Sequence, residues 1–194
     1  MFNQYIITIG VSTGGPSALE EILPELPADF PAPVIIVQHM PAKFTARLAE
    51  RLHQLCKIRV VEAQNGARIE NGTAYITPGG MHLEVTPQFT IRILQAKEGD
   101  QFVPCIDTTF SSIARNADRK KILGIILTGM CKDGVLGLKE IKDAGGITIA
   151  QDKTTSVVFG MPKAAIELGC VDYVLPLRRI AGKIVEIVKE KLGT

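Results

Sequence analysis

The first residue of this sequence that could take part in a reaction is a serine in a glycine-rich turn. Residues 10–16 read GVSTGGP, so Ser12 fits the pattern G-x-S-x-G and precedes a proline typical of a first helical turn. The free N–H groups and positive dipole end of such a helix would favour an anion beside Ser12. This suits a nucleophilic serine and a tetrahedral oxyanion, although a turn that binds phosphate or caps a helix has the same pattern.

A serine hydroxyl needs a base to take its proton, and the sequence offers three histidines. His39 directly follows an apolar segment, which puts it at the carboxyl end of a predicted strand, where open α/β sheets place their sites. His53 lies within a predicted helix, where a structural role is expected. His82 begins a short candidate strand and could equally lie at the rim of a site or on a surface loop. His39 is therefore the predicted base.

An acid must hold the imidazole in its working tautomer. Asp133 lies in a glycine-flanked loop, residues 128–134, that follows another apolar segment and reaches the same predicted sheet edge. Its alternative role is an N-cap for the helix that follows, and one residue can do both. Asp107 is the rival acid and is itself a candidate N-cap for a helix over 110–117. The chain order Ser, His, Asp differs from the α/β-hydrolase order Ser, Asp, His.

Short apolar segments must position these groups. Residues 5–9, 34–37 and 122–127 are apolar at successive positions, which is typical of parallel strands covered by helices on both faces. Segments of helical period lie between them, as in βαβ units. We therefore predict an α/β fold with a three-layer α/β/α, doubly wound and mostly parallel sheet.

Two helices and a hairpin complete this prediction. Apolar residues recur at helical spacing in two segments that should pack on the sheet, 44–55 and 180–192. In the middle of the chain, three short alternating segments separated by Gly or Pro predict a small antiparallel appendage: 73–77, 82–86 and 90–94. The two segments that flank residues 87–89 are predicted to form its hairpin. No repeat or linker divides the sequence, so we predict one domain over residues 1–194.

Composition and charge exclude several classes of protein. The 194 residues carry 22 Lys and Arg against 20 Asp and Glu, a formal net charge of +2, so no broad positive field favours nucleic acid or anionic lipid. No apolar run approaches the roughly 18 residues of a membrane span, and residues 1–10 lack the pattern of a secretory signal. We expect a cytoplasmic protein without membrane insertion. Four cysteines with no CxxC pair argue against a metal site.

Four motifs occur in a distinctive order: GVSTGG (10–15), QHMP (38–41), ILTGMCKDG (126–134) and VVFGMP (157–162). Together they resemble the catalytic domain of the bacterial chemotaxis protein-glutamate methylesterase, the CheB type, over nearly the whole chain. The resemblance implies that Ser12, His39 and Asp133 are nucleophile, base and orienting acid. It also implies a parallel-sheet α/β/α fold and hydrolysis of glutamate γ-methyl esters on receptor signalling helices, often with deamidation of receptor glutamines.

The resulting hypothesis is acyl transfer through Ser12, with methylated receptor helices as the protein substrate and no cofactor. The N–H of Thr13 at the predicted helix start would contribute to an oxyanion hole, and the resemblance suggests the Met130 amide as its partner. A phosphate- or nucleotide-binding α/β module and an inactive partner-binding homologue are the alternatives. A basic stripe is expected to be a solvated helix face, with a rim for the receptor as its other interpretation: Lys43, Arg47 and Arg51.

Two departures from the family pattern bear on this hypothesis. Cys131 stands where the family usually has glycine, so a Cβ occupies a position at which glycine is free to take a positive φ. We do not expect Cys131 to be the nucleophile, because the turn of Ser12 has the glycines and helix start that acyl transfer needs. Family members also usually carry an N-terminal phosphoacceptor receiver domain, and we expect the catalytic domain alone.

Overall fold

The protein is built on one parallel sheet. The structure is a computed structural model and describes residues 5–118 and 121–193. Within these residues the main sheet has seven strands in the order β3-β4-β2-β1-β7-β8-β9, and all neighbouring pairs are parallel. The strands are β1 (Ile6–Val11), β2 (Val34–Gln38), β3 (Arg59–Glu62), β4 (Thr73–Ile76), β7 (Ile122–Ile126), β8 (Ile147–Gln151) and β9 (Tyr173–Leu175).

The central strands carry side chains that are buried on both faces. β1, β2 and β7 are buried at every position, which confirms the prediction from their uninterrupted apolar sequences. β1 continues past the predicted end to Val11, which pairs with Gln38 at the end of β2. Ser12 therefore follows the last residue of β1, and His39 follows the last residue of the adjacent strand β2.

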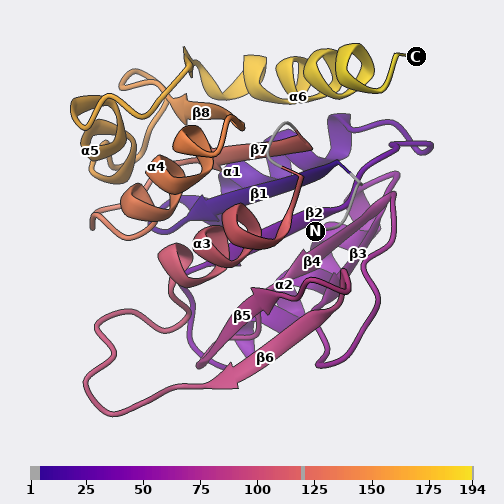
Figure 1. Ribbon diagram of the computed structural model, residues 1–194, viewed down its shortest axis with the longest axis vertical. Helices are drawn as coiled ribbons and strands as arrows, with labels where there is room; N and C mark the ends of the chain where they lie inside the picture. Colours follow the sequence, from indigo (N-terminus) through magenta and orange to yellow (C-terminus); the bar gives the residue numbers. More distant parts are fainter. Residues whose placement is uncertain (1–4, 119–120, 194) are drawn as a thin grey trace.

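Helices cover both faces of this sheet (Figure 1). One hydrophobic core contains the apolar faces of α1 (Gly15–Ile22), α2 (Phe44–Leu55) and α6 (Leu177–Leu192), with the short 3-10 helix η1 (Leu23–Glu25) after α1. The other core contains those of α3 (Ile106–Asn116), α4 (Val135–Asp143) and α5 (Met161–Glu167). The predicted three-layer α/β/α fold is confirmed, and the helix predicted from the apolar residues of 44–55 is α2, with Lys43 as its N-cap.

A two-stranded hairpin lies outside the main sheet. β5 (Met81–Val85) pairs antiparallel with β6 (Ile91–Gln95), as predicted. An isolated hairpin is marginally stable, and here side chains of α3 hold β5: Thr109 donates to the carbonyl of Leu83, and Ser112 accepts from the N–H of Val85. The hairpin therefore extends the layer formed by α3.

The prediction that residues 73–77 belong to the antiparallel appendage was wrong. Residues 73–76 form β4, which lies between β2 and β3 in the parallel sheet. The alternation of polar and apolar residue types suggested one solvent-facing side, but Thr73 and Tyr75 are both buried. The alternation of polar and apolar residue types therefore did not indicate which side chains of this strand are exposed.

Strand order places the site. From β1 the chain first moves to β2 on one side, and it returns later to β7 on the other side. The loops after β1 and β7 thus leave the sheet at a switch in strand order, where open α/β sheets form a crevice at the carboxyl ends of their strands. Ser12 follows β1 and the acid loop, residues 128–134, follows β7.

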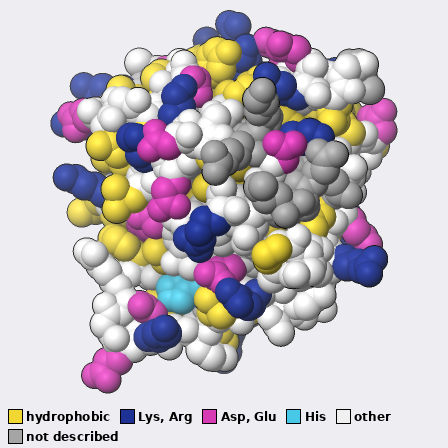
Figure 2. Space-filling view, viewed as in Figure 1, with side chains coloured by type: hydrophobic (Ala, Val, Ile, Leu, Met, Phe, Trp, Pro, Cys, Tyr) yellow, Lys and Arg dark blue, Asp and Glu magenta, His cyan; other side chains and the backbone are white. Residues whose placement is uncertain are grey.

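The surface carries charges of both signs. Figure 2 shows Lys and Arg side chains interspersed with Asp and Glu on one face of the molecule. This agrees with the small net charge of +2 and gives no broad field of one sign. Among the described residues, no helix combines the length and the apolar character that crossing a membrane requires.

Candidate active site

Ser12 lies in the turn between β1 and α1. Its N–H donates to the carbonyl of Thr128 (3.0 Å), and its own carbonyl accepts from the N–H of Gly15 (2.9 Å). The turn is therefore tied to the acid loop on one side and to the start of α1 on the other. Gly14, the N-cap of α1, has a φ of 82°, a left-handed conformation that favours glycine.

Gly10 serves packing rather than the turn itself. It lies within β1, and a Cβ on it would come within 2.5 Å of Cγ2 of Ile106. The missing side chain lets the first residue of α3 pack directly on β1. The first glycine of the G-x-S-x-G pattern thus brings the start of α3 close to the turn of Ser12.

His39 reaches Ser12 from the neighbouring strand. Its N–H donates to the carbonyl of Val11 (3.1 Å), and its ring atom Nδ1 lies 3.2 Å from Oγ of Ser12. Gln38, which ends β2 and is buried, donates from Nε2 to the carbonyls of both Ser12 and His39 at 3.0 Å. This amide fixes the two chain segments relative to each other next to the Ser12–His39 contact.

Asp133 binds the other nitrogen of the imidazole. Its Oδ2 lies 2.7 Å from Nε2 of His39, and its side chain is 1% exposed. A carboxylate can only accept, so Nε2–H is the donor, and in the neutral imidazole Nδ1 carries the lone pair that faces Ser12. In the serine proteases the base nitrogen is Nε2 and the acid binds Nδ1. In this site the two ring nitrogens exchange these positions, because Nδ1 faces the serine and Nε2 binds the aspartate.

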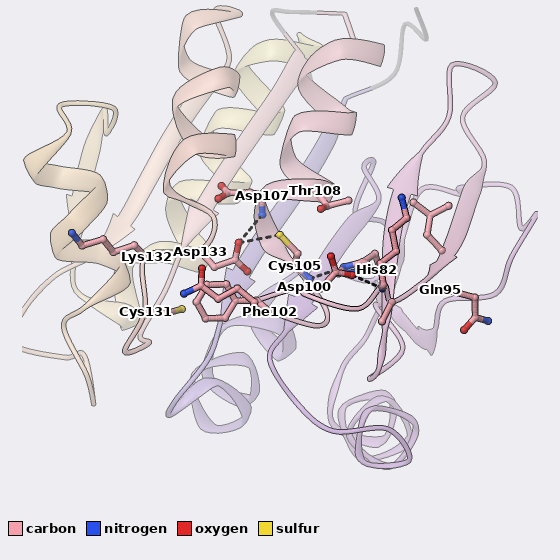
Figure 3. Close-up of a pocket in the computed structure, with 14 residues that line it drawn as sticks. His82, Gln95, Asp100, Phe102, Cys105, Asp107, Thr108, Cys131, Lys132 and Asp133 are labelled. Atoms are coloured by element: carbon pink, nitrogen blue, oxygen red, sulfur yellow. Dashed lines mark hydrogen bonds and ion pairs between the residues drawn. The ribbon is translucent and has the colours of Figure 1, made fainter.

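The carboxylate of Asp133 also occupies the start of α3 (Figure 3). Oδ2 accepts from the N–H of Ile106 (2.7 Å), and Oδ1 accepts from the N–H of Asp107 (3.1 Å) and the thiol of Cys105 (3.3 Å). Such first-turn N–H groups have no acceptor within their own helix. Asp133 was predicted to cap the helix that follows it, but it caps α3 instead. The helix that follows, α4, has Gly134 as its N-cap and no side-chain bond there.

Asp107, the rival acid, binds α4 rather than His39. It lies in the first turn of α3, which begins at Ile106 and not at the predicted residue 110. The helix starts earlier because Asp133 accepts from its first N–H groups. Oδ1 of Asp107 in turn accepts from the N–H of Gly137 (2.6 Å) in α4. The geometry favours Asp133 over Asp107 as the partner of His39.

Burial and hydrogen bonding move the pKa values of these groups in different directions. Burial alone would lower the pKa of His39, but hydrogen bonds to Asp133 and Cys131 raise that pKa to about 9. Burial would raise the pKa of Asp133, but the bonds that it accepts from His39, Ile106 and Asp107 hold it below its usual value. Burial and the charge of Asp133 raise the pKa of Asp107, although it accepts from a backbone N–H of α4. Asp133 is therefore held as the carboxylate.

Two exposed residues with unbonded backbone N–H groups lie in the segments next to Ser12. Within residues 5–118 and 121–193, the N–H groups of Thr13 and Met130 have no protein acceptor. Met130 is 79% exposed, and its neighbour Gly129 is so close to Ser12 that a Cβ there would lie 2.8 Å from the serine Cβ. Both N–H groups are thus free to bind a ligand oxygen. These are the two residues that the sequence suggested for an oxyanion hole.

Cys131 lies in the acid loop with its thiol facing the site. Its Sγ is 3.8 Å from Nδ1 of His39, the nitrogen that also faces Ser12 at the shorter distance of 3.2 Å. The non-glycine residues with positive φ in the described chain are Lys43 and Phe89. Cys131 therefore carries no left-handed strain, and the expected conflict between its Cβ and a positive φ does not arise.

The other two histidines have structural contacts. Nδ1 of His53 on α2 accepts from the N–H of Val60 (3.3 Å) at the start of the neighbouring β3. His82 is buried rather than on a surface loop: its Nε2 lies 2.9 Å from Oδ2 of Asp100, and its Nδ1 accepts from the N–H of Cys105 (3.1 Å). In the described chain, no three His, Cys, Asp or Glu side chains are grouped to hold a metal ion.

The basic stripe on α2 is only partly available to a ligand. Arg51 forms an ion pair with Glu20 on α1, with Nε 2.9 Å from Oε1. Lys43 and Arg47 are exposed. The expectation of a solvated helix face agrees with this arrangement.

Sequence reasoning missed two residues that contact the site. Gln38 joins the segments of Ser12 and His39, and the signal for it was a polar residue at the end of an apolar strand. The ring of Phe102 stacks on the imidazole of His39, with centroids 5.4 Å apart and planes inclined by 4°. Its only signal was one aromatic residue in the polar segment before α3, because the contact joins parts of the chain that are distant in sequence.

Comparison with known proteins identifies the family. The family described as CheB methylesterase matches this chain over residues 7–184. The chain belongs to the CheB methylesterase family. The match contains the whole Ser12–His39–Asp133 contact chain and confirms the resemblance seen in the four sequence motifs.

Relatives and a solved structure agree with this family. The chain is 48% identical over 190 residues to a protein of Archaeoglobus fulgidus called protein-glutamate methylesterase/protein-glutamine glutaminase. The aligned region covers 96% of this chain and 54% of the relative. A Dechloromonas aromatica relative of the same kind is 49% identical, over 93% of this chain and 50% of its own. This chain thus spans about half the length of these curated relatives. The crystal structure of the Thermotoga maritima CheB methylesterase catalytic domain matches with a TM-score of 0.92 and 42% identity, covering 96% of this chain and all of that one.

Proposed function

We propose that this chain is a serine hydrolase that cleaves glutamate γ-methyl esters on the signalling helices of chemotaxis receptors or related cytoplasmic signalling proteins. Ser12 is the nucleophile, His39 the base and Asp133 the orienting acid. The contact chain from Oγ of Ser12 to Nδ1 of His39 (3.2 Å), and from Nε2 of His39 to Asp133 (2.7 Å), supports this most directly. Membership of the CheB methylesterase family supports the substrate class.

The first half of the reaction transfers the acyl group to Ser12. Nδ1 of His39 takes the hydroxyl proton while Oγ attacks the ester carbonyl carbon, and Asp133 stabilises the imidazolium through Nε2–H. The tetrahedral oxyanion accepts from the N–H groups of Thr13 and Met130, each worth about 3 kcal/mol of transition-state stabilisation. The bond to the methoxy oxygen then breaks, and Nδ1–H protonates the leaving group to give methanol.

The second half returns the enzyme to its starting state. His39 takes a proton from water, the resulting hydroxide attacks the glutamyl ester, and Ser12 leaves with a proton from Nδ1–H. The products are a free glutamate side chain and methanol. An amide of glutamine follows the same steps with ammonia as the leaving group, so we extend the proposal to glutamine deamidation, in line with the printed names of the relatives.

Release of methanol from receptor that carries radiolabelled methyl esters tests this function. Ser12→Ala and His39→Gln should each lower turnover by at least about 10³-fold, because members of such a unit fail together. His53→Gln is the matched control, since His53 bonds the backbone of β3, and it should be near neutral. Equal damage from His53→Gln and His39→Gln would show that the base is wrongly assigned.

A covalent probe separates this function from the two alternatives. An aryl sulfonyl fluoride should label Ser12 in the wild-type chain and fail to label Ser12→Ala. A turn that only cradles phosphate would leave Ser12 unlabelled, and a partner-binding homologue without activity would release no methanol. Labelling at any residue other than Ser12 would contradict the proposed nucleophile.

A further inference from the structure

A loop that no motif singled out covers the imidazole of His39. Residues 96–105, here called the Phe102 loop, connect β6 to α3. The two ring nitrogens of His39 are engaged at their edges by Ser12 and Asp133. Phe102 lies against the flat face of the same ring, with centroids 5.4 Å apart and an angle of 4°. This is an offset stack of the kind that aromatic pairs prefer.

The stack removes a motion that the hydrogen bonds allow. Bonds at Nδ1 and Nε2 leave the imidazole free to rotate about the line joining its two partner oxygens. This rotation keeps both distances but turns the bonds away from the directions in which the partner oxygens bond best. A parallel ring on one face opposes this rotation. Phe102 also keeps water from that face, which strengthens the His39–Asp133 interaction by lowering the local dielectric.

One buried histidine bonds the loop on both sides of Phe102 in the sequence. His82 of β5 is 7% exposed; its Nδ1 accepts from the N–H of Cys105, and it therefore donates through Nε2–H to Asp100. The same Oδ2 of Asp100 accepts from the N–H of Lys97 (2.6 Å). The loop is thus clipped to β5 before and after Phe102. Figure 3 shows the Asp100–His82 contact and Phe102 beside Asp133 and Cys131.

Core packing alone does not fix this loop. Residues of the loop line an open pocket of about 940 Å³ that is also lined by Leu94 and Thr108. Because Phe102 itself lines this open space, its ring can keep its place on His39 only if the backbone on either side is anchored. The contacts of His82 with Asp100 and Cys105 supply that anchor.

We propose that Phe102 is a positioning residue for His39, and that the His82–Asp100 clip holds Phe102 in place. The inference rests on the proposed esterase function of Ser12, and it adds that catalysis depends on a loop distant in sequence from all three residues of the contact chain. Phe102 acts on the orientation of the base rather than on the ester itself. Its loss should therefore change the rate of the chemical step more than substrate binding.

Kinetics of Phe102 variants test the first part. Phe102→Ala should lower kcat by roughly 10- to 100-fold with KM changed by less than about 2-fold, because a small misplacement of a catalytic group affects the transition state. Phe102→Tyr and Phe102→Trp keep a flat ring and should restore most of kcat, whereas Phe102→Leu should not. Gln101→Ala, an exposed neighbour in the loop, is the control. Equal activity of the Leu and Tyr variants would overturn the stacking role.

A spectroscopic measurement separates failure of this inference from failure of the proposed function. In protein with isotope-labelled histidine, His39→Gln identifies the imidazole signals of His39. Phe102→Ala should remove the ring-current shift from these signals and speed exchange of the Nε2–H proton with water. This readout applies whether or not the wild type hydrolyses esters. His39 signals unchanged by Phe102→Ala would overturn the inference, and a wild type without turnover would overturn only the function.

A double-mutant cycle tests the clip. Asp100→Ala should shift the His39 signals in the same direction as Phe102→Ala and lower kcat by a smaller factor. If the clip acts through Phe102, Asp100→Ala should add little in a chain that already carries Phe102→Ala. Multiplication of the two losses in the double variant would show that Asp100 acts by another route and would overturn the second part of the proposal.

Discussion

Two aspartates lie at the starts of α3 and α4, and only one of them binds the imidazole. Asp133 precedes α4 but accepts from the first N–H groups of α3, whereas Asp107 lies in α3 and accepts from the N–H of Gly137 in α4. Each carboxylate thus caps the other helix. The pKa of Asp133 is held below its usual value, and that of Asp107 is raised above it.

The difference comes from the number and charge of the donors. Asp133 accepts from two backbone N–H groups, a thiol and the imidazole, which together outweigh the cost of burial. Asp107 lies close enough to feel the charge of Asp133 and accepts from fewer donors. Two residues of one type at neighbouring helix starts therefore differ in chemistry, and the arrangement that caps two helices also holds the imidazole of His39.

Among the changes that test this contrast, Asp133→Asn should have the largest effect. The amide cannot stabilise an imidazolium and favours the wrong tautomer of His39, so turnover should fall by about 10³- to 10⁴-fold. Methanol release under single-turnover conditions measures this loss, with Asp107→Asn as the matched variant. A loss below about 10-fold for Asp133→Asn would break the contrast between the two aspartates.

The pH dependence of wild-type turnover should be the next largest effect. The base works only when His39 is neutral, and its pKa is raised to about 9 by hydrogen bonds to Asp133 and Cys131, against the lowering effect of burial. kcat/KM should therefore rise with pH by about tenfold per unit below that value and level off above it. Ser12→Ala measured in parallel corrects for alkaline hydrolysis of the ester. A flat profile between pH 7 and 9 would mean that His39 is already neutral at pH 7.

Substitution of Asp107 should affect stability more than turnover. Asp107→Ala removes the acceptor for the N–H of Gly137 and should lower the free energy of unfolding by about 1 kcal/mol, the usual cost of a lost helix cap. Asp107→Asn keeps an acceptor oxygen and should lose less. Urea denaturation measures both. If Asp107→Asn lowered kcat as much as Asp133→Asn, the assignment of separate roles would fail.

The smallest effect should come from Cys131→Gly. The thiol contributes to the raised pKa of His39, so its removal should move the midpoint of the pH profile slightly downward while maximal turnover stays within about 3-fold. Cys131→Ser, which keeps a polar group near Nδ1, should move the midpoint less. Complete inactivity of Cys131→Gly in a folded chain would instead indicate that the thiol takes part in the chemistry.

Much of the fold could be predicted because the signals are local. The unbroken apolar segments of β1, β2 and β7 and the 3.6-residue period of α2 and α6 depend only on which side chains must leave water. The hairpin was predicted from its turn residues. The segment of β4 was misplaced because its short alternation does not distinguish an edge ribbon from a strand buried between two others.

The residue types and their order were enough to predict that Ser12 and His39 each follow an apolar strand and that an aspartate lies in a third loop at the same sheet edge, because parallel strands bring their carboxyl ends to one edge. The folded structure supplies the rest. It shows that Asp133 rather than Asp107 binds His39, that Nδ1 faces the serine, and that Phe102 covers the ring. These outcomes depend on the packing of α3 against β1 and on the path of a long loop. Both are set by contacts between residues far apart in the chain, which leave no periodic trace in the sequence.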